Sequence, residues 1–141
     1  MTCRYGALEF GTRLEAQWAA FFDLAGWKWR SNPAPIHDWR ANFLVEFPCG
    51  HSECNSTHSL LVSVVPAEKL EGLETHPALG HTYMVKNEQG NWVADAGAVF
   101  GASPEISRWQ MSHGAGGGSY DVPFWVDDAR DLWRQAATKI G

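Results

Sequence analysis

Apolar residues near the start of the chain recur at steps of three and four positions. The residues that share this spacing are Leu14, Trp18, Phe21, Phe22 and Ala25. They would lie on one face of an amphipathic helix. Thr12 with Glu15 three positions later is a capping-box signature, and Gly26 suits the end of a helix. The pattern therefore predicts a helix over residues 11–26.

Strand-like patterns follow this helix. Residues 27–30 alternate apolar and cationic side chains, and residues 39–47 are rich in apolar ones, so each segment predicts a strand. Residues 60–65 form an uninterrupted apolar run, which predicts a central strand buried on both faces. A short helix over residues 67–73 and a further strand over residues 82–85 are also expected.

The last third of the chain is predicted to be mainly helical. Pro104 after Ser103 is typical of a helix entry, so we expect a short helix from there to about Met111. The glycine run at 114–118 would connect it to a final helix that begins after Asp121. The inner face of that helix would consist of Trp125, Ala129, Leu132, Trp133, Ala136 and Ile140. The predicted class is α/β or α+β, with one domain over residues 1–141 and a central mixed sheet flanked by helices.

Composition and charge narrow the class of protein. The chain has 141 residues, of which 45% are hydrophobic, enough for an independent core and too many for a disordered protein. No run approaches the roughly 18 apolar residues of a membrane span, and the first residues do not resemble a signal peptide. A cytoplasmic protein with no membrane partner is expected. The net charge of −5 disfavours nucleic-acid binding, which usually requires a basic face.

One polar loop carries candidate metal ligands. Cys49, His51, Cys54 and His58 offer two thiolates and two imidazoles within ten positions, the ligand types that zinc prefers. Their C-x-H-x2-C-x3-H spacing differs from the common zinc-finger spacings. The alternative is a polar loop whose cysteines pack as small apolar side chains. Three cysteines are too few, and odd in number, for a disulfide framework.

A group of tryptophans and arginines flanks the proline-rich turn near residues 32–35. Exposed tryptophan beside arginine is typical of a binding hot spot. The candidate binding residues are Trp27, Trp29, Arg30, Trp39 and Arg40. The alternative for each of them singly is a structural role.

Three segments resemble small phage and prophage proteins of the PD-(D/E)XK nuclease superfamily. GTRLEAQWAAFF over residues 11–22, followed by GW, is similar to the first helix of that family. WRANFLV over residues 39–45 matches the strand in which the family has Pro-Asp-Phe. LLVSVVP over residues 60–66 matches the strand reading Leu-Val-Glu-Val-Lys-Pro. The resemblance implies a restriction-endonuclease-like fold.

The chain departs from this family at the residues that carry its chemistry. In active members an Asp and a Glu hold a divalent metal, and a Lys helps to activate the attacking water. Here Asn42, Ser63 and Val65 stand at these three positions, and only Glu15 matches the Glu of the family's helix. Neutral Asn and Ser are poor ligands for a hard cation. The motif is therefore interpreted as degenerate and the protein as catalytically inactive.

Three functional hypotheses follow. The first is a cofactor-free binding protein, in its most specific form a phage-encoded inhibitor of a host protein or defence ribonucleoprotein complex, in the manner of an anti-CRISPR protein. The fold would then tolerate reversion of the three motif positions to Asp, Glu and Lys. The second is a metal-dependent DNA nuclease with relocated carboxylates. The residues that could supply them are Glu15, Asp38, Glu46 and Glu53. The third is a nucleic-acid-binding module stabilised by zinc.

Overall fold

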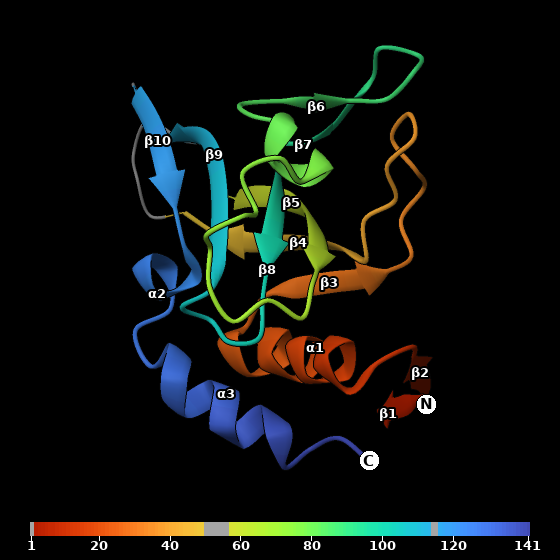
Figure 1. Cartoon of the computed structure of the whole chain (residues 1–141), viewed down its shortest axis with the longest axis vertical. Coiled ribbons are helices and arrows are strands. Elements are labelled where there is room, and N and C mark those ends of the chain that lie inside the picture. The colour runs from red at the N-terminus through yellow and green to blue at the C-terminus, as the bar shows by residue number, and fades with distance from the viewer. Residues whose placement is uncertain (1, 50–56, 114–115) are drawn as a thin grey trace.

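A six-stranded mixed sheet runs through the middle of the molecule (Figure 1). The computed structural model describes residues 2–49, 57–113 and 116–141. The strands, in their order across the sheet, are β10 (Gly116–Tyr120), β9 (Ser107–His113), β8 (Ala96–Phe100), β5 (Thr57–Val64), β4 (Phe43–Pro48) and β3 (Lys28–Ser31). β5 and β8 are parallel, and the other neighbouring pairs are antiparallel. The predicted fold class, a mixed sheet with helices, is confirmed.

The first predicted helix is present as α1 (Arg13–Ala25). The Thr12 side chain accepts a hydrogen bond from the backbone N–H of Glu15 (3.1 Å), as the capping-box pattern indicates. Gly26 ends the helix in the left-handed conformation, with φ of 78°, which glycine adopts without steric cost. Local sequence therefore determines both ends of α1.

One face of the sheet packs against α1 and two further helices, α2 (Val122–Trp125) and α3 (Ala129–Ala137) (Figure 1). Trp18 of α1 is fully buried at the centre of this layer, with its ring against Phe100 of β8 and Trp133 of α3. The hairpin of β1 (Cys3–Tyr5) and β2 (Leu8–Phe10) lies at the end of α1. This layer contains most of the large aromatic side chains.

The opposite face of the sheet has a smaller apolar cluster of its own. It is covered by the 3-10 helix η1 (Pro77–Gly80) and by a two-stranded sheet of β6 (Val85–Lys86) and β7 (Trp92–Ala94). Trp39 and Ala78 lie in this cluster with Leu61 of β5. β5 therefore contributes to both apolar layers, as its uninterrupted hydrophobic run predicts.

The helix predicted from Ser103 to about Met111 is wrong. Residues 107–113 form strand β9, because the side chains of Ser107, Trp109 and Met111 are buried in alternation with exposed or half-buried neighbours. This alternation, with a period of two residues, outweighs the helix-start signal of Ser103 and Pro104, which here begins only a turn. The glycine run was expected to connect two helices, and this is wrong as well, since residues 116–120 form β10 and pair with β9.

Three further boundaries differ from those predicted. Residues 67–73 form bends and turns, and the nearest short helix is η1. The strand expected over residues 82–85 is wrong for residues 82–84, and only Val85 lies in a strand, β6. The predicted C-terminal helix is broken into α2 and α3 at residues 126–128, although Asp121 caps its start as predicted. None of the helices in the described part of the chain combines the length and apolar composition needed to cross a bilayer.

Gly97→Ala is expected to destabilise the protein by about 2 kcal/mol, because a methyl group at this position would collide with the carbonyl oxygen of Ala78 in η1 and approach the ring of Trp39. The shift in the midpoint of urea unfolding measures this cost. Gly116→Ala is the matched control, since a methyl group there meets no atom within 4 Å and should change stability by less than about 0.5 kcal/mol. An unchanged midpoint for Gly97→Ala would mean that η1 does not pack closely against β8 at this position.

Candidate functional site

The residues at the degenerate motif positions lie on adjacent strands. Asn42 directly precedes β4, and its backbone N–H donates to the carbonyl of Val62 in β5 (2.7 Å). The side-chain oxygen of Asn42 accepts a hydrogen bond from the backbone N–H of Val64 (2.7 Å). Asn42 therefore joins the start of β4 to the end of β5 through its backbone and its side chain.

Ser63, at the second motif position, is buried at the edge of a tryptophan ring. It is only 5% exposed, and its hydroxyl accepts a hydrogen bond from the indole N–H of Trp39 (2.8 Å). The Trp39 ring is stacked on His81 with ring centroids 4.9 Å apart, and Gly97 of β8 leaves room for it. The N–H edge of the indole therefore lies directly against the Ser63 hydroxyl.

His81 completes this arrangement as an uncharged partner of the indole. Burial lowers the pKa of His81, and the nearby charge of His37 lowers it further. The backbone carbonyl of His81 accepts a hydrogen bond from the N–H of Gly97 (2.8 Å), which fixes the segment against β8. The ring of His81 is therefore held next to Trp39 by the backbone as well as by stacking.

The two remaining motif positions also have structural roles. Glu15 lies in the first turn of α1, where its backbone N–H is capped by Thr12 and its carboxylate is 3.4 Å from the Thr12 hydroxyl. Val65 packs against the smaller apolar cluster, and its backbone N–H donates to the carbonyl of Phe100 (3.0 Å). Each of the four positions is thus occupied by a residue that supports the fold.

Of the carboxylates considered as relocated ligands, Glu15 is itself a motif position, and Glu46 and Asp38 are exposed. Glu46 is exposed on β4, where its cross-strand neighbours are Lys28 and Ser59. Asp38 is exposed in the connection between β3 and β4. Glu53 lies outside the described residues. Within the three described ranges, Cys49, His58 and His113 are the one set of three or more acidic, histidine or cysteine side chains close enough to hold a metal.

The structure distributes the five candidate binding residues between core and surface. Trp27 and Trp39 are both buried, so the tryptophans that were expected at a surface lie inside the protein. Trp29 is half-buried, and its indole N–H donates to the Asp23 carboxylate (2.8 Å). Arg30 and Arg40 are exposed. Only the arginines and part of Trp29 are therefore accessible to a partner.

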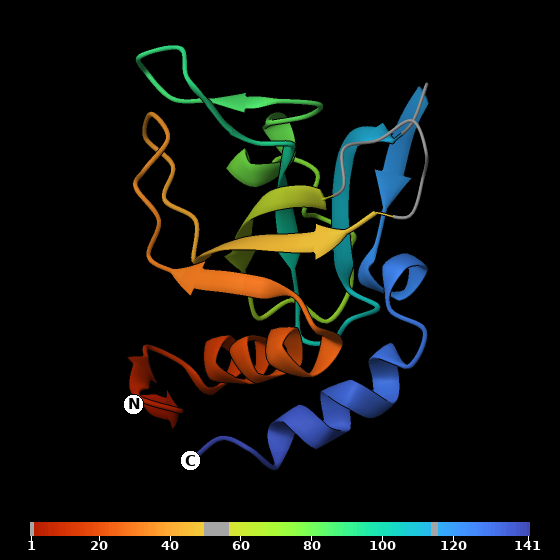
Figure 2. The ribbon, with the colours of Figure 1, turned by 180° about the vertical axis from the view of Figure 1, so that it is seen from behind.

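A groove near Arg30 offers an exposed tryptophan that sequence reasoning missed. It lies between the connection from β3 to β4 and the β6–β7 hairpin, two segments that approach each other in Figure 2. Trp92 of β7 is 57% exposed and lines this groove together with Arg30 and Pro35. The position of Trp92 between Asn91 and Val93 gives no local indication that its side chain is exposed.

The candidate zinc ligands are brought together only in part. Cys49 follows β4 and His58 lies on β5, and their ligand atoms lie within 4.8 Å of each other and of His113. His51 and Cys54 lie outside the described residues. His113, which lies outside the polar loop that carries the predicted ligands, is the last residue of β9 and is half-buried. The cluster therefore combines two predicted ligands with one that the sequence spacing does not indicate.

Asp95 supports this cluster from the side. Its carboxylate oxygen is 3.3 Å from Nδ1 of His58 and accepts a hydrogen bond from the backbone N–H of Ser59 (2.9 Å). The backbone N–H of Asp95 in turn donates to the carbonyl of Ser59 (2.9 Å). These contacts hold the His58 ring in a fixed orientation, with Nδ1 directed towards Asp95.

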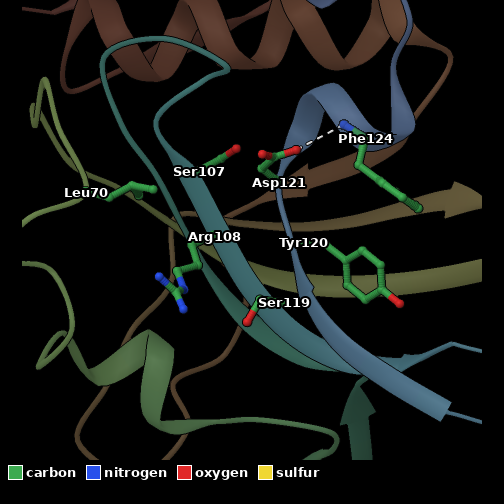
Figure 3. A pocket seen from close by; sticks show the side chains of 7 residues that line it. All are labelled: Leu70, Ser107, Arg108, Ser119, Tyr120, Asp121 and Phe124. Atoms are coloured by element: carbon green, nitrogen blue, oxygen red, sulfur yellow. Dashed lines mark hydrogen bonds between the residues drawn. The ribbon is translucent and has the colours of Figure 1, made fainter.

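Two polar side chains of a second hollow, beside β9 and β10, are engaged in the fold (Figure 3). The Ser107 hydroxyl donates to the carbonyl of Pro104 (2.7 Å) and accepts from the N–H of Val122 (2.9 Å). Asp121 caps α2 by accepting a hydrogen bond from the N–H of Phe124 (3.0 Å). These side chains have structural partners, so we do not assign a reaction to this hollow.

Comparison with known proteins identifies no relative of this chain. No family model, curated protein or solved structure matches this chain. Any assignment of function therefore depends on the geometry of the sites described above.

Proposed function

We propose that this chain acts by binding a macromolecular partner and does not hydrolyse nucleic acid. The observation that supports this most directly is the position of Trp39, whose indole N–H donates a hydrogen bond to the buried hydroxyl of Ser63 (2.8 Å). Metal-assisted phosphodiester hydrolysis needs an open site with oxygen ligands for a divalent cation. At Ser63 there is instead a neutral, buried hydroxyl whose hydrogen-bond partner is an indole N–H.

The charge of the chain favours one class of partner. A net charge of −5 suits contact with the positively charged surface through which another protein holds nucleic acid. The most specific form of this proposal is an inhibitor of a bacterial defence ribonucleoprotein, comparable to an anti-CRISPR protein and acting in the cytoplasm of the host. Its partner would be the protein surface rather than the nucleic acid.

The groove lined by Arg30 and Trp92 is the contact surface we infer for this partner. Tryptophan and arginine are enriched among the residues that contribute most to binding free energy. Trp92 is 57% exposed, so its ring would lose much of its contact with water when a partner covers it. Proline residues on the facing loop give this side of the groove a restricted backbone.

A cleavage assay tests whether the chain is a nuclease. We expect no cleavage of plasmid or single-stranded DNA with Mg²⁺ or Mn²⁺, because the motif positions lack metal-binding carboxylates. Metal-dependent cleavage that is abolished by Glu15→Ala or Glu46→Ala would contradict the proposal and support the relocated-carboxylate hypothesis. If the native chain does not cleave DNA, Glu15→Ala and Glu46→Ala should likewise show no cleavage.

Capture from host lysate with matched variants tests the binding surface. We expect the native chain to recover a nucleic-acid-binding complex in stoichiometric amount, with release at high salt. Trp92→Ala should lower recovery about 10-fold or more. Phe124→Ala is the control, since Phe124 is 60% exposed but lies on α2, away from the groove. Equal recovery by both variants would exclude this groove as the interface.

A further inference from the structure

Three strand ends place a thiol and two imidazoles at one point of the molecule. Cys49 follows β4, His58 is near the start of β5, and His113 ends β9. β8 lies between β5 and β9 but begins at Ala96, whose partner in β5 is Leu60, so β8 does not extend between the two histidines. Their rings consequently approach each other, with centroids 5.7 Å apart.

The spacing of the three ligand atoms suits a tetrahedral metal. Bonds of about 2.0–2.1 Å to nitrogen and 2.3 Å to sulfur give distances between ligand atoms of roughly 3.3–3.6 Å around zinc. The ligand atoms of Cys49, His58 and His113 all lie within 4.8 Å of one another. Binding of zinc therefore requires the three side chains to move closer together.

The types of ligand atom favour one metal ion over others. A thiolate with two imidazoles suits Zn²⁺, whereas Mg²⁺ and Ca²⁺ prefer oxygen ligands. Asp95 is placed as the carboxylate that commonly orients a metal-bound histidine, because its oxygen is 3.3 Å from Nδ1 of His58. Nε2 of His58 is then the nitrogen that would bind the metal.

Two of the three ligands are buried, which favours a centre that stabilises the fold, although three protein ligands leave the fourth tetrahedral position of zinc open. Cys49 is 9% exposed and His58 is 5% exposed. The ring of Trp125 lies 5.6 Å from His58 and 5.1 Å from His113, centroid to centroid, and Phe47 lies 5.7 Å from His58. These aromatic side chains restrict the approach of water and substrate to the ligands.

We propose that Cys49, His58 and His113 bind a structural Zn²⁺, with Asp95 as the residue that orients His58. The metal links the end of β4 and the start of β5 to the end of β9, and so joins segments more than fifty positions apart in the sequence. This proposal does not depend on the proposed function, because the zinc centre lies on the opposite face of the sheet from Ser63 and Trp39.

Zinc analysis of the full chain, purified without a polyhistidine tag from zinc-supplemented medium, tests this proposal. We expect about one zinc per chain, and a melting temperature that falls by about 10 °C when a strong chelator removes it. Replacement by Co²⁺ should give a thiolate-to-cobalt charge-transfer band that Cys49→Ser removes. Zinc near zero, or a chelator without effect on the melting temperature, would overturn the proposal.

The variant His113→Gln distinguishes a zinc site that includes His113 from a zinc site formed only by residues of the loop at positions 49–58. The variant should lose zinc or bind it at least about 100-fold more weakly, whereas His37→Gln, at an exposed position outside the cluster, should bind it normally. His113→Cys keeps a zinc ligand at the position and should restore binding even if His113→Gln fails to fold. Asp95→Asn should weaken zinc affinity about 10- to 100-fold. Native affinity in His113→Gln would overturn the assignment of His113.

Discussion

Ser63→Glu is expected to destabilise the folded protein by about 3 kcal/mol or more, because it places a carboxyl group at a position that is only 5% exposed. The larger side chain would also displace Trp39 from the hydroxyl to which its indole N–H donates. Urea unfolding at pH 7 measures the loss.

The pH dependence of this variant distinguishes charge from volume. Burial raises the pKa of an introduced carboxyl above its unfolded value, so the folded state binds more protons and stability falls as pH rises above the unfolded pKa. The deficit of Ser63→Glu relative to the native protein should therefore be smaller near pH 4.5 than near pH 8. A deficit independent of pH would mean that steric displacement of Trp39 accounts for the whole effect.

Asn42→Asp is the matched control for this prediction. A carboxylate oxygen can accept the N–H of Val64 as the Asn42 amide oxygen does, so the change should alter stability by less than about 1 kcal/mol. We therefore expect reversion to Asp to be tolerated at Asn42 and reversion to Glu to be costly at Ser63, in contrast to the expectation that the fold tolerates reversion of the whole motif.

Trp18→Ala is expected to cost about 4 kcal/mol, the range observed when a fully buried aromatic residue is replaced by alanine. The ring packs against Phe21, Phe100 and Trp133, with centroids 5.2, 4.7 and 4.5 Å away, so its removal leaves a cavity between α1, α3 and the sheet. The indole N–H also donates to the carbonyl of Gly101 (2.9 Å), which would lose its partner.

Thermal and urea unfolding of three variants test this assignment. Trp18→Phe keeps part of the packing and removes the hydrogen bond, so its stability should fall between those of Trp18→Ala and the native protein. Trp92→Ala is the surface control, with an expected change of less than about 0.5 kcal/mol. Equal losses for Trp18→Ala and Trp92→Ala would contradict the position of Trp18 at the centre of the helical layer.

Features encoded by neighbouring residues were predictable from the sequence. Thr12, Glu15 and Gly26 define α1 through local capping contacts, and the run at 60–65 identifies the central strand because both its faces meet apolar layers. The helix predicted after Ser103 is wrong because a local start signal was given more weight than the alternation from Ser107 to Met111. Pairing with β8 and β10 makes this segment a strand, and pairing is a long-range property.

The candidate metal centre was only partly predictable for the same reason. Cys49 and His58 lie nine positions apart, so spacing alone suggests a common site. His113 reaches them only through the order of strands β5, β8 and β9 and through the late start of β8. The burial of Trp39 depends likewise on Gly97 and His81, which are distant in sequence.

The position of β5 between the two apolar layers has a consequence for folding cooperativity. Leu60 and Val62 belong to the layer beneath the helices, whereas Leu61 belongs to the layer beneath η1. Loss of the pairing of β5 with β4 and β8 would expose side chains of both layers at once. The two layers are therefore parts of a single cooperative unit, and neither can unfold while the other keeps its native packing around this strand.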